Sequence, residues 1–218
     1  MKVLIVSATP FEAQLPDSLF QVFTAKGYNP NDGRIPVLVS GPGIMSCVFS
    51  LAETLQHYHP DIIINMGIAG SLKSAIKIGT HCVVASDYLI DSGIFRNNVF
   101  THLRDCDFSL NNDKLFRATA DILPLMPECS AVHGQTVGLF YDLPLHQRPE
   151  PYQQSAADIE TMEGAAVFYV AASKGIPVCS IRTISNTVGI AHEPGQFLNA
   201  VTSNCAIIET LISRLGAS

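Results

Sequence analysis

The 218-residue sequence predicts an α/β fold in which helices cover both faces of a sheet, and three observations support this prediction. Short apolar runs typical of buried strands alternate with longer amphipathic stretches typical of helices. Hydrophobic residues make up 47% of the chain and charged residues only 15%, which indicates an extensive core and room for a buried subunit interface. A chain of this length fits one domain that buries about 70% of its unfolded surface.

The first half of the chain alternates apolar strand patterns with one helix pattern. The strand patterns are continuous apolar runs, and the helix pattern stops before Pro60 because proline cannot continue a helix. In order, we expect a strand at Val3–Ser7, a strand at Val37–Ser40 that ends in Gly41-Pro42-Gly43, a helix at Ile44–His57, a strand at Ile62–Ile64 that runs into residues 65–71, and a strand at Val83–Asp87.

The second half begins with a polar, irregular stretch at residues 91–112, which we expect to be a long surface loop. Residues 141–155 contain three prolines and no periodic pattern, so they are also expected to be loop. The other expected elements are a helix at Lys114–Leu123, a strand at Ser130–Val137, a strand at Ala157–Thr161, a helix at Glu163–Ser173 stopped by Gly175, a strand at Pro177–Ser185 and a helix at about Gly195–Leu215. Repeats and low-complexity segments are absent from the sequence, and residues 1–218 are expected to form one domain.

Composition argues against several classes of protein. A net charge of −6 disfavours nucleic-acid binding, which needs clustered Lys and Arg on the phosphates. The six cysteines are scattered without any C-x-x-C pair, so we expect free thiols in a reducing compartment, with no disulfide frame and no metal site. Neither a signal peptide nor an apolar run of about 20 residues is present, and a cytoplasmic protein with no membrane partner is the default expectation.

Polar residues or glycine clusters follow four of the predicted strands, and ligands of open α/β sheets collect at the carboxyl ends of strands. Glu12 follows the first strand, where a carboxylate can act as a base on water or can simply be a solvated loop acid. Residues 67–70, Gly-Ile-Ala-Gly, follow the third strand. Glycine there allows close backbone approach to a ligand, but tight turns also use glycine for steric reasons alone.

The other two strand ends carry Glu163 and Asn186. Glu163 stands at a predicted helix start, where a carboxylate either complements the helix dipole or accepts hydrogen bonds from the cis hydroxyls of a ribose. Met162 beside it would provide a soft apolar surface for the sugar. Asn186 ends the last strand, where it is either an ordinary turn residue or a donor and acceptor for a ligand.

Three phrases together resemble the purine nucleoside phosphorylase and nucleosidase superfamily, in order and spacing across nearly the whole chain. They are Asn-Met-Gly-Ile-Ala-Gly at 65–70, Ile-Glu-Thr-Met-Glu-Gly-Ala-Ala at 159–166 and Ile-Arg-Thr-Ile-Ser-Asn at 181–186. Within that superfamily, Glu-Thr-Met-Glu-Gly-Ala-Ala and Ser-Asn in place of Ser-Asp are similar to the futalosine hydrolases of menaquinone biosynthesis. The resemblance implies a three-layer α/β/α fold around a twisted mixed sheet, a homo-oligomer (dimer or tetramer) and a purine nucleoside as small-molecule partner, with no cofactor.

The resemblance also implies roles for the residues at the strand ends. Glu12 matches the acid that activates water in the nucleosidases, and Met162 with Glu163 matches the ribose-binding pair. Asn186 stands where the methylthioadenosine nucleosidases have an aspartate that protonates the base at N7. The purine would lie against Ala69 and Gly70 and against the stretch Thr136, Val137 and Gly138, which aligns loosely.

Two departures from the superfamily pattern narrow the expected reaction. Phosphorylases carry an arginine for phosphate in the loop after the first strand, whereas residues 9–17 here contain no Lys or Arg and hold Glu12. A carboxylate repels phosphate but polarises water, which favours hydrolysis. At position 186, an amide that donates to N7 and to a 6-oxo group favours hypoxanthine over adenine, provided that the amide is oriented that way.

These features predict hydrolysis of the N-glycosidic bond of a purine nucleoside, with futalosine as the first candidate substrate. Open alternatives are a methylthioadenosine/S-adenosylhomocysteine nucleosidase, a purine nucleoside phosphorylase and a nucleoside-binding protein without turnover. The sequence leaves undecided which of Arg34, Arg96, Arg104 or Arg148 would meet the aryl carboxylate at the 5′ end of futalosine.

Overall fold

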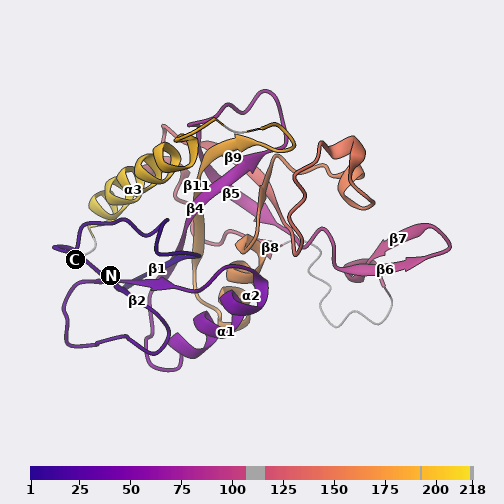
Figure 1. Cartoon of the computed structure of the whole chain (residues 1–218). Helices are drawn as coiled ribbons and strands as arrows, with labels where there is room; N and C mark the ends of the chain where they lie inside the picture. The colour runs from indigo at the N-terminus through magenta and orange to yellow at the C-terminus, as the bar shows by residue number, and fades with distance from the viewer. Residues whose placement is uncertain (107–115, 192, 217–218) are drawn as a thin grey trace.

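The computed structural model describes residues 1–106, 116–191 and 193–216, and it contains a large mixed sheet with helices on both faces (Figure 1). The strands are β1 (Val3–Ser7), β2 (Phe20–Phe23), β3 (Ile35–Val39), β4 (Ile62–Ser71), β5 (His81–Asp87), β6 (Gly93–Arg96), β7 (Val99–His102), β8 (Phe116–Arg117), β9 (Ser130–Thr136), β10 (Ile159–Thr161) and β11 (Val178–Thr187). The α-helices are α1 (Ile44–Thr54), α2 (Gly164–Lys174) and α3 (Gln196–Leu215), and short 3₁₀ turns lie at Leu103–Asp105, Leu123–Leu125, Leu145–Gln147 and Tyr152–Gln154.

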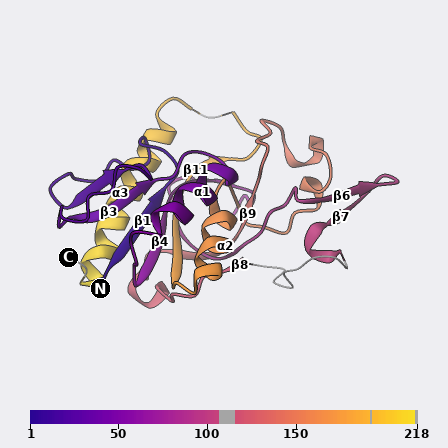
Figure 2. The same ribbon diagram turned by 90° about the horizontal axis from the view of Figure 1, so that it is seen from below.

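The three layers follow from the alternation of apolar side chains along the strands. Val3 and Ile5 of β1 face α3, and Leu4 and Val6 face the opposite side, where α1 and α2 pack together. Figures 1 and 2 show α3 on one face of the sheet and α1 with α2 on the other. The predicted α/β fold with a central mixed sheet is therefore confirmed.

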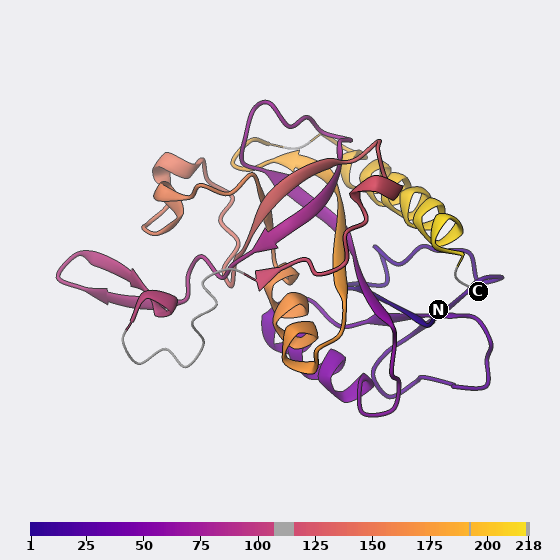
Figure 3. The same ribbon diagram turned by 180° about the vertical axis from the view of Figure 1, so that it is seen from behind.

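The main sheet runs in the order β2, β3, β1, β4, β11, β5, β9, β10. Neighbours are parallel except at β5–β11, and β8 pairs antiparallel with the last two residues of β5. β10 also pairs antiparallel with β4, so that within the described chain β4, β11, β5, β9 and β10 close into a ring of strands. Figure 3 shows this ring from behind, with both chain ends at the opposite side of the sheet. Gly70 of β4 consequently has Glu160 of β10 as one neighbour and Asn186 of β11 as the other.

Several predicted elements differ from the structure. The helix expected at Lys114–Leu123 is wrong for its described part, because Phe116 and Arg117 form β8 against β5 and Thr119 hydrogen-bonds to Val178 in extended conformation. The expected loop at 91–112 contains the hairpin β6–β7, and residues 107–112 lie outside the described ranges. The hairpin extends away from the sheet in Figures 1 and 2.

β2 was not predicted, because its four residues lack a long apolar run. The stop signal after α2 is confirmed: Gly175 has a φ of 66°, a left-handed conformation that glycine adopts at little cost, and its N–H caps the helix.

Candidate active site

A cleft of about 430 Å³ lies at the carboxyl ends of β1, β4 and β11 and at the start of α2. Parallel strands place their carboxyl ends at one edge of a sheet, which is why polar residues far apart in the sequence meet here. Of the residues predicted to form a site, Glu12, Ala69, Gly70, Val137, Met162, Glu163 and Asn186 line this cleft. Residues that also line it and were not predicted include Phe11, Pro42, Phe140, Glu160, Val188 and Phe197.

Glu12 is buried and held at both carboxylate oxygens, which differs from a solvated loop acid. The hydroxyl of Thr9 donates to Oε2 at 2.9 Å, and the backbone N–H of Ile68 donates to Oε1 at 3.2 Å. The turn from Thr9 to Glu12 is closed by the N–H of Glu12 donating to the carbonyl of Thr9. The carboxylate is thereby fixed between the end of β1 and the backbone of β4, facing the cleft.

Arg182 was not predicted as a site residue, yet its guanidinium approaches the same place as Glu12. It is fully buried in β11, and Nη1 donates to the carbonyl of Met66 at 3.1 Å. Nε and Nη2 have no hydrogen-bond partner among the described residues. A Cβ at Gly67 would lie 2.4 Å from Arg182 Nη1 and 2.6 Å from Glu12 Oε1, so both charged groups occupy the space that a side chain at this position would need.

Glu163 reaches across to the other helix start instead of capping its own. It is the N-cap residue of α2, but its side chain makes no capping hydrogen bond there. Its Oε1 instead accepts the N–H of Gly43, the N-cap residue of α1, at 2.7 Å. Burial raises the pKa of Glu163, the Gly43 N–H and Arg182 lower it, and Glu12 raises it further. Glu163 therefore lies at the start of a helix, as predicted, and its side chain lines the cleft.

Asn186 lies just after a β-bulge in β11, between Ile184 and Asn186. The hydroxyl of Ser185 has two acceptors within hydrogen-bond distance. It donates to Asn186 Oδ1 at 2.8 Å, and the Ala69 carbonyl lies further away, at 3.2 Å. The hydrogen bond from Ser185 uses one lone pair of Oδ1, and the Nδ2 donor is available to a ligand. It lies 3.5 Å from the position that a Cβ of Gly70 would occupy.

Of the three residues at the end of β9, only Val137 lines the cleft. Met162 packs against the small cluster that contains Val137, as a partly buried side chain. Thr136 points into the ring of strands, where its hydroxyl donates to Asp87 Oδ1 at 2.9 Å and accepts the N–H of Ala165. The N–H of Gly138 donates to Asp91, and the residue is exposed outside the cleft.

Asp87, the last residue of β5, is a buried acid that does not line the cleft. Its Oδ2 has no hydrogen-bond partner among the described residues, and it lies where Cβ atoms of Gly134 and Gly164 would be. Burial raises the pKa of Asp87 to about 7, opposed by the Thr136 hydroxyl and Arg182. Asp87 is therefore linked through the Thr136 hydroxyl to the N–H of Ala165 in the first turn of α2.

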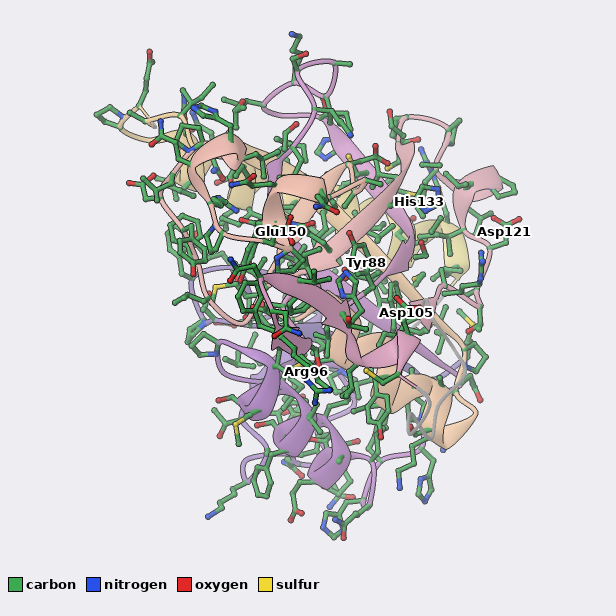
Figure 4. The ribbon with its side chains drawn as sticks, turned by 90° about the vertical axis from the view of Figure 1, so that its right-hand side faces the viewer. Tyr88, Arg96, Asp105, Asp121, His133 and Glu150 are labelled. Atoms are coloured by element: carbon green, nitrogen blue, oxygen red, sulfur yellow. The ribbon has the colours of Figure 1, made fainter. Side chains whose placement is uncertain are left out.

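Within the described residues, no lysine or arginine lines the cleft. Arg148 forms a buried ion pair with Glu160 at 2.8 Å, and Arg34 pairs with Asp32 on the surface. Arg96 lies on the hairpin β6–β7, as Figure 4 shows, and the side chain of Arg104 is outside the described part. No cluster of three metal-ligating side chains occurs in the described ranges, and none of their helices has the length and hydrophobicity of a membrane span.

The chain is similar to known proteins over nearly its whole length. The family model of the phosphorylase superfamily matches residues 2–215 of the chain. Among solved structures, futalosine hydrolase of Helicobacter pylori is 16% identical with a TM-score of 0.73, covering 98% of this chain and 97% of that one.

Two nucleosidase structures are similar to the same extent. The 5′-methylthioadenosine/S-adenosyl homocysteine nucleosidase of Campylobacter jejuni is 17% identical with a TM-score of 0.76, over 99% of this chain and 98% of that one. A putative nucleosidase of the same kind from Borrelia burgdorferi, bound to adenine, is 21% identical with a TM-score of 0.74, over 97% and 99%. At these identities the likeness establishes a common fold.

Proposed function

The chain belongs to the phosphorylase superfamily, and from that premise we propose that it hydrolyses the N-glycosidic bond of a purine nucleoside. The observation that carries the proposal is that Glu12 Oε1 and Arg182 Nη1 approach the same side of Gly67, 2.6 Å and 2.4 Å from the position its Cβ would take, and that Glu12 lines the cleft together with Glu163. A carboxylate beside a fixed cation is suited to bind a water molecule and accept its proton.

The ribose is expected to lie between Glu163 and Met162. The carboxylate of Glu163 accepts hydrogen bonds from the cis 2′- and 3′-hydroxyls, while its bond from Gly43 holds it in place. The apolar side chain of Met162 contacts the sugar face. This arrangement fixes C1′ relative to Glu12 before any bond is broken.

In the proposed reaction the bond from C1′ to N9 breaks early, and its electron pair leaves with the base. Asn186 stabilises the negative charge that develops on the base, because its Nδ2 donates more strongly as that charge grows. Water attacks the oxocarbenium-like C1′, and Glu12 takes the proton that the water loses, as in single-base inverting hydrolysis. The departing base is protonated from solvent, so the products are the free sugar and the neutral base.

Water is favoured over phosphate because of the charge at the cleft. Glu12 would repel a phosphate dianion, and no basic side chain lines the described cleft. Of the two buried arginines near the cleft in the described chain, Arg182 donates to the Met66 carbonyl and Arg148 is paired with Glu160.

The proposed substrate is futalosine. The donor Nδ2 of Asn186 suits the N7 and 6-oxo positions of hypoxanthine, and it would oppose the 6-amino group of adenine. Phe11, Phe140 and Phe197 line the cleft and would suit an aryl group at the 5′ position.

Incubation with futalosine, inosine and methylthioadenosine, each with and without phosphate, tests the proposal by chromatography of the released base. Release of hypoxanthine from futalosine without added phosphate is expected. Cleavage of methylthioadenosine, without cleavage of futalosine or inosine, would instead identify a methylthioadenosine nucleosidase. A requirement for phosphate would identify a phosphorylase, and tight binding without release would identify a nucleoside-binding protein.

A further inference from the structure

Glu160 is a buried acid of the cleft for which the proposed reaction has no use. It lies in β10 opposite Gly70 of β4, and Asn186 of β11 lies opposite the same glycine on its other side. Residues in register on neighbouring strands present their side chains to the same face of a sheet. Glu160 and Asn186 both line the cleft, with the bare backbone of Gly70 between them.

The position of the Glu160 carboxylate is fixed by two donors on its far side. Gln135 Nε2 and Arg148 Nη1 each donate to Oε2 at 2.8 Å, and both of these side chains are fully buried. Among the described residues no donor is assigned to Oε1. The arrangement presents one oxygen of an ion-paired carboxylate to the cleft.

Arg148 is fully used in holding this carboxylate and the segment that carries it. Its Nε donates to the carbonyl of Leu143 at 2.8 Å, and Nη2 donates to the carbonyl of Tyr141. A buried ion pair costs desolvation energy that an apolar pair of the same size would avoid. A ligand that donates a hydrogen bond to Oε1 would account for a buried carboxylate at this position despite the desolvation cost.

Resting on the proposed function, we propose that Glu160 determines base specificity by accepting the N1–H of a 6-oxopurine. With the base above Gly70, Asn186 Nδ2 donates to the N7 and 6-oxo edge while Glu160 Oε1 accepts from N1–H. Adenine reverses both positions: its 6-amino group is a donor facing the amide donor, and its N1 lone pair faces the carboxylate. A buried site made for one pattern rejects the other, because each mismatch leaves a desolvated group unpaired.

The test measures binding of the free bases hypoxanthine and adenine by calorimetry, beside turnover of the nucleosides. The natural protein is expected to prefer hypoxanthine. Glu160→Gln should weaken hypoxanthine binding roughly 10- to 100-fold, as expected for loss of a hydrogen bond to a charged group, without weakening adenine binding. The matched control is Glu150→Gln, which replaces an exposed acid labelled in Figure 4, on the 141–155 segment that also carries Arg148, and which should change neither affinity.

A second variant separates recognition from folding. Glu160→Gln with Arg148→Met removes both charges, so that no unpaired guanidinium is left buried. The double variant should be folded and should keep the altered base preference. Retention of the natural preference for hypoxanthine in both variants, or binding of neither base to the natural protein, would overturn the inference.

The two proposals fail in distinguishable ways. Glu160-dependent preference for hypoxanthine without nucleoside cleavage would refute the hydrolase function and support the role of Glu160. Cleavage with a 6-oxo to 6-amino preference that Glu160→Gln leaves unchanged would support the hydrolase function and refute the role of Glu160.

Discussion

Glu163 Oε1 accepts the backbone N–H of Gly43 at 2.7 Å, and this hydrogen bond joins the starts of helices α1 and α2 at the cleft. The Glu163 side chain does not cap α2, and Gly43 has no side chain with which to cap α1. The bond therefore fixes one oxygen of Glu163 and satisfies an N–H at the start of α1. It does so with a carboxylate whose pKa is raised by burial, so the charge is held at a cost to stability.

Glu163→Gln should separate activity from stability. The amide can still accept from Gly43 with its oxygen, but it cannot accept from both ribose hydroxyls, and kcat/KM should fall roughly 100-fold. Because the folded-state pKa of Glu163 is raised, ionisation destabilises the fold as pH rises through that pKa, and glutamine removes this penalty. Calorimetry at pH 8 should give a Tm equal to or above that of the natural protein. A large fall in Tm would mean that the carboxylate is needed for folding.

Glu12→Gln should abolish turnover while the nucleoside still binds. Loss of the base on water is expected to lower kcat by about 10²–10⁴-fold, with little change in Kd measured by calorimetry. Glu53→Gln on α1, which replaces a partly exposed acid outside the cleft, is the matched control. Undiminished kcat in the Glu12 variant would remove it from the mechanism.

Gly67→Ala should inactivate the enzyme by entering the space between Arg182 and Glu12. Gly67 has a φ of 146°, and the added Cβ would meet both charged groups at less than 3 Å. Gly79→Ala separates strain from this effect, because Gly79 has a φ of 85° and a Cβ there would meet nothing within 4 Å. Both variants should lose about 1–2 kcal/mol of stability from backbone strain, but only Gly67→Ala should lose activity beyond what its stability explains.

Asn186→Asp should shift base preference toward adenine nucleosides. A protonated aspartate can donate to N7, and its other oxygen can accept from the 6-amino group, whereas the amide donor suits a 6-oxo group. The ratio of kcat/KM for 6-amino and 6-oxo substrates is the measurement. An unchanged ratio would show that Asn186 does not read the 6-position.

Asp87 should make the protein less stable as pH rises from about 4 to 7. Its pKa is raised from an ordinary value of 3.8 to about 7, so over this range the unfolded chain loses a proton that the folded chain keeps. The linked loss is about 4 kcal/mol at 1.36 kcal/mol per pKa unit. Asp87→Asn should flatten the dependence of Tm on pH between 4 and 7, whereas Asp142→Asn, at an exposed position, should leave it unchanged. An equally steep dependence in Asp87→Asn would assign the effect to another group.

The sequence was sufficient for the layers of the fold and for the convergence of Glu12, Glu163 and Asn186. Apolar runs identify buried strands irrespective of their partners, and parallel strands bring their ends together by geometry. The pairing of β10 with β4 could not be predicted from the sequence, because a strand of three residues is too short to show a periodic pattern. The short β8 was mistaken for part of a helix for the same reason.

Arg182 and Glu160 were missed as site residues because each stands inside a strand. Their functions depend on which strands lie beside them, and local sequence does not specify this. The signal available for Arg182 was a charged residue within the apolar run 178–184, which requires a buried partner. Thr136 was expected to contact the purine base. Because side chains alternate between the two faces along β9, its hydroxyl instead donates to Asp87 inside the ring of strands.

The ring of strands has a consequence for the order in which the molecule folds. Gly70 must pair with β11 and with β10, which are distant in the sequence, before Asn186 and Glu160 can face each other. Pairings between distant segments are slow to form, because chain entropy is lost before contacts compensate. Refolding molecules should therefore regain helical circular dichroism before they regain nucleoside binding, because the strand pairings that form the cleft are completed last.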